Sequence, residues 1–83
     1  MAVEVTLYTR RPCFLCDKAK ASIRAATSLH RLPIDLREVD VDGDAALRER
    51  FTNDVPVIYV NGVEAFRHRV SPQEFADYVI ARS

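Results

Sequence analysis

One stretch decides the fold of this chain: Val3-Glu4-Val5-Thr6-Leu7-Tyr8-Thr9-Arg10-Arg11-Pro12-Cys13-Phe14-Leu15-Cys16. Its first half alternates apolar and polar side chains, which is the pattern of a half-buried strand, and Pro12 ends that strand. The only two cysteines of the chain follow, three positions apart, where the composition becomes helical. Two thiols at this spacing can close a small disulfide, so the stretch predicts a strand, then a redox pair, then a helix.

The rest of the sequence continues the alternation of strand and helix patterns. The spacing of apolar residues predicts strands at 3–9, 34–41, 55–60 and 63–69, and helices at 13–28, 45–51 and from 72 onward. The order β-α-β-α-β-β-α predicts an α/β fold in which helices flank a mixed four-stranded sheet. Two parallel βαβ crossovers and one hairpin would build this sheet. This is the minimal thioredoxin-like arrangement.

Local turn and cap signals support these boundaries. Asn61-Gly62 lies between two β-favouring runs and predicts a tight hairpin, because both positions of a type I′ turn need positive φ. Ser71-Pro72-Gln73-Glu74 combines an N-cap serine, a first-turn proline and a glutamate that completes a capping box. Asp42 or Asp44 is expected to cap the short middle helix.

Length and composition limit the classes of function. The 83 residues predict a single domain, 1–83, and the formal net charge of zero argues against nucleic acid as a partner. No apolar run approaches the length needed to span a bilayer, so no membrane role is expected. The first residues lack a signal-peptide pattern, which favours the cytoplasm. In that compartment a disulfide is more often transient and catalytic than structural.

The positions of the two cysteines predict different roles for them. Cys13 should lie where free backbone N–H groups and the positive end of a helix dipole converge, near the cations of Arg10 and Arg11. We therefore expect a lowered pKa for Cys13. Cys16 shares a helix face with apolar residues, so it should be the more buried sulfur. Cys13 would attack the substrate, and Cys16 would resolve the mixed disulfide.

Other interpretations compete at both candidate sites. A zinc site would need more ligands than His30 and His68 provide, so no metal is expected. Cys13 as an inert apolar residue is disfavoured by its exposed position after Arg-Arg-Pro. At Val55-Pro56, the simplest interpretation is a proline at the edge or start of a strand. The alternative is a cis bond that lets the Val55 backbone pair with an extended substrate chain.

These residues resemble a known family. The run from Tyr8 to Cys16, Asp40 at the end of a strand, Val55-Pro56-Val57-Ile58 and Asn61-Gly62 are similar to those of glutaredoxins, especially small glutaredoxin-like proteins with C-x-L-C-D. The resemblance implies that Cys13 is the nucleophile, Cys16 the resolving thiol and Pro56 a cis-proline facing the pair. It also implies that Arg10 replaces a lysine that contacts a glutathione carboxylate.

The chain departs from the usual glutaredoxin pattern in two places. Glutaredoxins usually have C-P-Y-C, where this chain has Phe14-Leu15 between the cysteines. They also have a Gly-Gly pair after the hairpin, where glutathione lies against the backbone, and this chain has no glycine after Gly62. Arg67 or Arg69 could hold a carboxylate there instead. Both arginines are otherwise interpreted as solvated charges on an edge strand.

The sequence therefore predicts a glutaredoxin-like thiol-disulfide oxidoreductase that reduces protein or mixed disulfides through Cys13 and Cys16. We expect substrate contacts from Arg10, Val55 and Pro56, no tightly bound cofactor, glutathione as a candidate co-substrate, and a monomer. Three alternatives stay open. They are a redoxin recharged by a flavoprotein reductase, a non-catalytic thioredoxin-fold binding module, and a redox sensor that turns over no substrate.

Overall fold

The structure is a computed structural model that describes residues 2–51 and 53–82. The elements in chain order are β1 (Val3–Thr9), α1 (Phe14–His30), β2 (Ile34–Asp40), a 3₁₀ turn η1 (Val41–Gly43), α2 (Ala45–Arg50), β3 (Val57–Val60), β4 (Val63–Arg67) and α3 (Pro72–Arg82). Apart from η1, this is the predicted order of elements.

The four strands form one mixed sheet in the order β2-β1-β3-β4. β1 is parallel to β2 and antiparallel to β3, and β3 and β4 form the predicted hairpin. The prediction of two parallel crossovers was therefore wrong, since only β1-α1-β2 is one. The six residues of α2 span about 9 Å, too short to carry the chain back along a seven-residue strand of about 23 Å. The chain instead reverses direction after α2.

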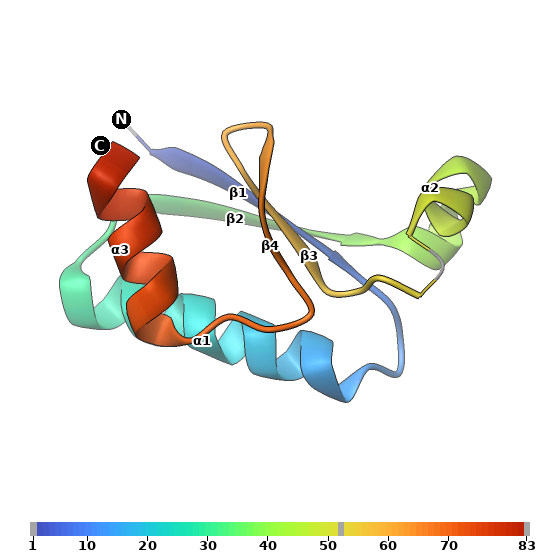
Figure 1. Ribbon diagram of the computed structural model, residues 1–83, viewed down its shortest axis with the longest axis horizontal. Helices are drawn as coiled ribbons and strands as arrows, with labels where there is room; N and C mark the ends of the chain where they lie inside the picture. The colour runs from blue at the N-terminus through green and yellow to red at the C-terminus, as the bar shows by residue number, and fades with distance from the viewer. Residues whose placement is uncertain (1, 52, 83) are drawn as a thin grey trace.

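Two helices cover one face of the sheet. In Figure 1, α1 and α3 lie together against that face, and α2 lies at the end of the sheet where β2 stops. The main core fills the space between helices and strands. It consists of the buried side chains of Val5, Leu7, Ala19, Ile23, Ala26, Ile58, Val60, Val70, Phe75, Ala76 and Val79. The predicted inner face of α1, Cys16, Ala19, Ile23 and Ala26, is buried.

A second, smaller core lies at the α2 end of the sheet. Val41, Phe51 and Val57 are fully buried there, and the rings of Tyr8 and Tyr59 pack around Phe51. The centroids of Tyr8 and Phe51 are 4.9 Å apart, and those of Tyr8 and Tyr59 are 5.3 Å apart at a near-perpendicular angle. Such contacts add stability beyond burial alone. This cluster anchors α2 and the chain that leads into β3.

The predicted turn and caps are present. Asn61 and Gly62 have φ values of 50° and 82°, as a type I′ turn requires. Asp44 caps α2, because its Oδ1 accepts the N–H groups of Ala46 and Leu47. Ser71 and Glu74 form the capping box reciprocally, at 3.0 and 3.1 Å.

Several boundaries differ from the prediction. β2 and α2 each end one residue earlier than predicted, at Asp40 and Arg50. Cys13 is the N-cap of α1 and not its first residue, and α1 continues to His30. β3 begins at Val57 and not at Val55, since Pro56 has no N–H to donate to a strand ladder. β4 ends at Arg67 and not at Arg69, because His68 has a φ of 67° and turns the chain toward α1. Within 2–51 and 53–82, no helix combines the length and apolar character needed to cross a membrane.

Candidate redox site

The candidate site begins where β1 delivers the chain to α1. Cys13 has an extended backbone, with φ −150° and ψ 107°, and it caps the helix through its side chain. Its Sγ accepts the backbone N–H of Cys16 at 3.1 Å, and its carbonyl accepts the N–H of Asp17 at 3.2 Å. A sulfur in this position receives a hydrogen bond and the positive end of the helix dipole, both of which stabilise a thiolate.

The two cysteines are joined by a disulfide, and their sulfurs differ in exposure. The Cα atoms are 5.2 Å apart, within the usual range for a bridge. Cys16 is 3% exposed and belongs to the buried face of α1, whereas Cys13 is partly exposed. The expected asymmetry in burial is confirmed. Cys13 is therefore the more accessible of the two cysteines to an external disulfide.

Val55 and Pro56 lie at the same end of the sheet as the cysteines. Tyr8 is paired with Val57 in the antiparallel ladder. Thr9, which follows Tyr8, and Pro56, which precedes Val57, therefore lie at the end of the sheet from which the chain continues to Cys13. The Val55-Pro56 peptide bond is cis, Pro56 is fully buried and Val55 is half-buried. Among the described residues, no backbone hydrogen bond involves Val55.

Arg10 lines a cleft of about 520 Å³ that also includes Cys13. Its Nε donates to Oδ2 of Asp42 at 3.0 Å, an exposed ion pair that ties the β1–α1 loop to η1. The cleft also contains the pair of Lys20 and Glu38, 2.9 Å apart. The predicted arginine is therefore near Cys13, in surroundings of mixed charge. The lining residues are Thr9, Arg10, Arg11, Pro12, Cys13, Asp17, Lys20 and Glu38.

A charge cluster beside Val55 was not predicted. Arg67 donates to both carboxylate oxygens of Glu64, at 2.7 and 2.9 Å, and its Nη1 lies 3.0 Å from Oδ2 of Asp54. The Nε2 atom of His68 lies 3.3 Å from the other oxygen of Asp54. The hydrogen bond from Arg67 lowers the pKa of Glu64, and the same bond raises the pKa of Arg67. Asp54 thus fixes the loop before Pro56 to the end of β4.

The hairpin register contained a signal for this cluster. A two-residue turn at Asn61-Gly62 places the segment before β3 beside the end of β4, so a partner for Asp54 among Arg67, His68 and Arg69 could have been sought. The two candidate arginines differ in their contacts. Arg67 already binds two carboxylates, whereas no hydrogen bond or ion pair of the Arg69 side chain occurs within the described part of the chain.

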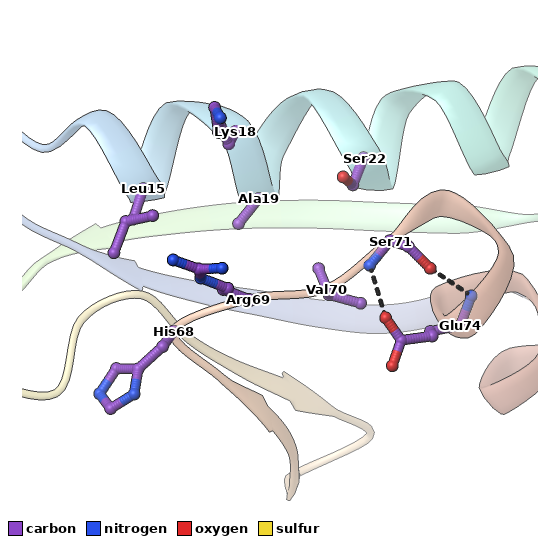
Figure 2. Close-up of a pocket in the computed structure, with 9 residues that line it drawn as sticks. All are labelled: Leu15, Lys18, Ala19, Ser22, His68, Arg69, Val70, Ser71 and Glu74. Carbon is purple, nitrogen blue, oxygen red and sulfur yellow. Dashed lines mark hydrogen bonds between the residues drawn. The ribbon is translucent and has the colours of Figure 1, made fainter.

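A groove of about 390 Å³ runs beside α1 on the side of Arg69. Figure 2 shows α1 above residues 68–71, with Leu15 and Ala19 pointing down and the Arg69 side chain lying between the two segments. His68 points away from α1, and its Nε2 lies beside Asp54. Within residues 2–51 and 53–82, no group of three or more His, Cys, Asp or Glu side chains is placed to hold a metal ion.

A family model described as "Glutaredoxin-like domain (DUF836)" matches residues 4–79. The chain belongs to this glutaredoxin-like family. The match spans both cysteines, the Val55-Pro56 bond and most of α3. Membership of the glutaredoxin-like family, together with the Cys13–Cys16 pair, supports a redox role for the protein.

Individual relatives agree with this assignment. "Glutaredoxin-like protein YDR286C homolog" of Dictyostelium discoideum is 29% identical over 73 residues, which cover 83% of this chain and 68% of that protein. The structure of XcR50 from X. campestris is 26% identical with a TM-score of 0.78, covering 93% of this chain and 96% of that one. A malaria parasite thioredoxin-2 shares the fold, at 22% identity and a TM-score of 0.72, over 99% of this chain and 84% of that one.

Proposed function

We propose that this protein is a thiol-disulfide oxidoreductase that reduces protein or mixed disulfides through Cys13 and Cys16. The observation that carries the proposal is the difference between two sulfurs of one disulfide. Cys13 is partly exposed and its Sγ accepts a helix N–H at 3.1 Å, whereas Cys16 is 3% exposed. A reaction that begins with an external disulfide needs one accessible thiolate and one protected thiol beside it.

The reaction proceeds in two exchanges. The Cys13 thiolate attacks one sulfur of the substrate disulfide, and the other substrate sulfur leaves as a thiolate that takes a proton from water. Cys16 then loses its proton and attacks Cys13, which releases the second substrate thiolate to be protonated in turn. The substrate gains two electrons and two protons, and the protein is left with the Cys13–Cys16 disulfide present in the structure.

Val55, Pro56 and Arg10 are proposed to position the substrate. An extended substrate chain beside Val55 would pair with a backbone that makes no hydrogen bond within the described residues. Arg10 lies in the Cys13 cleft and would contact a carboxylate of the substrate or of glutathione. None of these steps requires a tightly bound organic cofactor or a second copy of the chain. We expect a monomer that works in the cytoplasm.

Two electron donors fit this reaction. Two glutathione molecules would reduce the Cys13–Cys16 disulfide and become glutathione disulfide, which is the usual route for glutaredoxins. The alternative is a flavoprotein reductase that passes two electrons to the same disulfide. The absence of glycine between Gly62 and Pro72 favours this alternative, because side chains occupy the place where the usual Gly-Gly pair would let glutathione approach the backbone.

The experiment that tests the proposal compares the two donors on a neutral substrate, bis(2-hydroxyethyl) disulfide. One assay contains glutathione, glutathione reductase and NADPH, and the other contains a thioredoxin reductase and NADPH. NADPH consumption that requires Cys13 in either assay supports the oxidoreductase and identifies its donor. Cys13→Ser is the matched control. No Cys13-dependent turnover with either donor would overturn the proposal in favour of a binding module or a sensor.

A further inference from the structure

We propose that the groove between α1 and residues 68–71 binds an acidic segment of the protein substrate, and that Arg69 pairs with a carboxylate of that segment. This inference rests on the proposed function, because it concerns the substrate whose disulfide reacts with Cys13. It assigns a specificity-determining role to Arg69, whose side chain makes no hydrogen bond or ion pair within the described part of the chain.

The groove continues directly from the proposed substrate strand. The N–H of His68 donates to the carbonyl of Pro56 at 2.7 Å, so residues 68–71 start beside Pro56, the residue that follows Val55. At its other wall the groove contains Leu15, the residue before Cys16. A peptide whose disulfide meets Cys13 and whose backbone runs along Val55 can therefore extend into the groove without leaving the surface.

The lining of the groove combines an apolar floor with positive charge. Leu15, Ala19 and Val70 supply the apolar surface, and Lys18 and Arg69 supply the cations. Lys18 is already engaged, since its Nζ lies 4.8 Å from the centre of the Phe14 ring. Phe14 itself is 72% exposed beside Cys13.

The one acidic residue of the groove cannot neutralise Arg69. Oε1 of Glu74 accepts the backbone N–H of Ser71 at 3.0 Å, in the capping box of α3. Figure 2 shows this carboxylate turned toward Ser71, at the end of the groove away from Leu15. The neighbouring acids Asp54 and Glu64 are paired with Arg67. The groove therefore presents an uncompensated guanidinium, which fits a carboxylate from outside the chain.

The cleft on the opposite side of Cys13 contains cations and carboxylates together. Two of its cations are already engaged, because Arg10 contacts Asp42 and Lys20 contacts Glu38.

The test uses a matched pair of disulfide peptides in which the residues beside one cysteine are either glutamates or glutamines. The proposal predicts a kcat/KM about two- to fivefold higher for the glutamate peptide at low salt, the usual effect of an exposed ion pair, and a smaller ratio at high salt. Arg69→Gln should abolish the ratio, and Arg69→Glu should reverse it. Arg24→Gln, a cation on the β2 side of α1, should leave it unchanged.

Turnover of bis(2-hydroxyethyl) disulfide separates this inference from the proposed function. If all variants turn over that neutral disulfide while the wild type shows no preference for glutamate, the groove proposal is wrong and the oxidoreductase stands. If Arg69→Gln slows only glutathione disulfide, the groove serves the tripeptide carboxylate, and the protein-segment proposal is again overturned.

A second measurement does not depend on catalysis. Glutamate and glutamine peptides with serine in place of both cysteines are added to the oxidised protein, and NMR shifts are followed. The proposal predicts larger shifts at the Arg69 side chain and at Leu15 for the glutamate peptide than for the glutamine peptide at equal concentration. Equal shifts for both peptides, or none for either, would contradict it even if the protein proves to have no reductase activity.

Discussion

The two long helices that share one face of the sheet begin in different ways. α3 begins with Ser71 and Glu74, whose side chains and backbone N–H groups satisfy each other reciprocally. α1 begins with Cys13, whose sulfur accepts a single N–H, that of Cys16, while also bonding to the Cys16 sulfur. One helix start uses its cap for stability alone. The other helix is capped by the Cys13 sulfur, which can exchange one disulfide partner for another.

This difference explains where the chemistry lies. A hydroxyl cap has no accessible anion near neutral pH, so the N–H groups that it satisfies only stabilise the helix. A thiol in the same position uses those N–H groups to stabilise the thiolate, and the nucleophile becomes available at neutral pH. The same physics of a helix N-terminus thus gives a structural element at Ser71 and a candidate reactive centre at Cys13.

The largest expected effect comes from replacing each sulfur in turn. Cys13→Ser should reduce disulfide turnover to the background rate, because a serine hydroxyl does not ionise at neutral pH. Cys16→Ser should keep the first exchange and accumulate a mixed disulfide between Cys13 and the substrate. Mass spectrometry after mixing with a disulfide peptide checks both outcomes. Equal trapping by the two variants would show that the helix start does not distinguish the sulfurs.

The next effect concerns the pH dependence of Cys13. The helix N-terminus stabilises its charged form, so its pKa should lie well below the ordinary ~8.5 of a free thiol. The alkylation rate of reduced Cys16→Ser should therefore be half-maximal at a lower pH than the rate of free cysteine, and it should fall as the pH drops through the pKa. Free cysteine in the same buffer is the reference. A half-maximal rate at the same pH as free cysteine would contradict the assignment.

The third prediction addresses the start of α3. Ser71→Ala should lower the free energy of unfolding by about 1 kcal/mol, since it removes the N-cap acceptor for the N–H of Glu74. Urea denaturation measures this loss, and Ser28→Ala, at an exposed position in the last turns of α1, is the matched control. The alkylation rate of Cys13 should not change. A change in that rate would mean that the two helix starts are coupled.

The smallest effect is expected at an exposed charge pair outside both helix starts. The hydrogen bond from Arg67 lowers the pKa of Glu64 in the folded state, so the stability that this pair adds is present at neutral pH. It is lost as the pH falls through the lowered pKa. Glu64→Gln should therefore destabilise the protein slightly at pH 7, less than Ser71→Ala, and the difference from the wild type should vanish in acid. A difference that persists at pH 2 would assign the effect to packing.

The sequence was sufficient for the parts of the fold that local signals determine. Asn61-Gly62 and the box at Ser71 are short motifs whose geometry follows from backbone φ and hydrogen-bonding needs, and both are present as predicted. The burial of Cys16 followed from its helical spacing with Ala19 and Ile23. The direction of β3 was not predictable in this way. A helix pattern between two strands does not show whether the second strand runs parallel or antiparallel to its neighbour in the sheet.

The candidate site was predicted where its residues belong to short motifs. Cys13, Cys16 and Arg10 were identified from one motif and Val55-Pro56 from another, but the cluster of Asp54 with Arg67 and His68 joins segments that only the hairpin register brings together. An irregularity between Ile58 and Tyr59 shifts that register by one residue and places Arg67 opposite Val57. Uninterrupted counting from the turn would have placed Phe66 there. The distinct roles of Arg67 and Arg69 follow from this shift.

β1 pairs along all seven of its residues with β2 and along four of them with β3, and it leads through buried Thr9 to the cysteines. Central strands of this kind have amide hydrogens that exchange last with solvent, because they are released only by global unfolding. The base of the reactive pair therefore belongs to the most slowly exchanging part of the protein, whereas Val55 and the groove at Arg69 belong to loops that open sooner. Under mild denaturation the protein should lose its choice of substrate before it loses its reactive thiol.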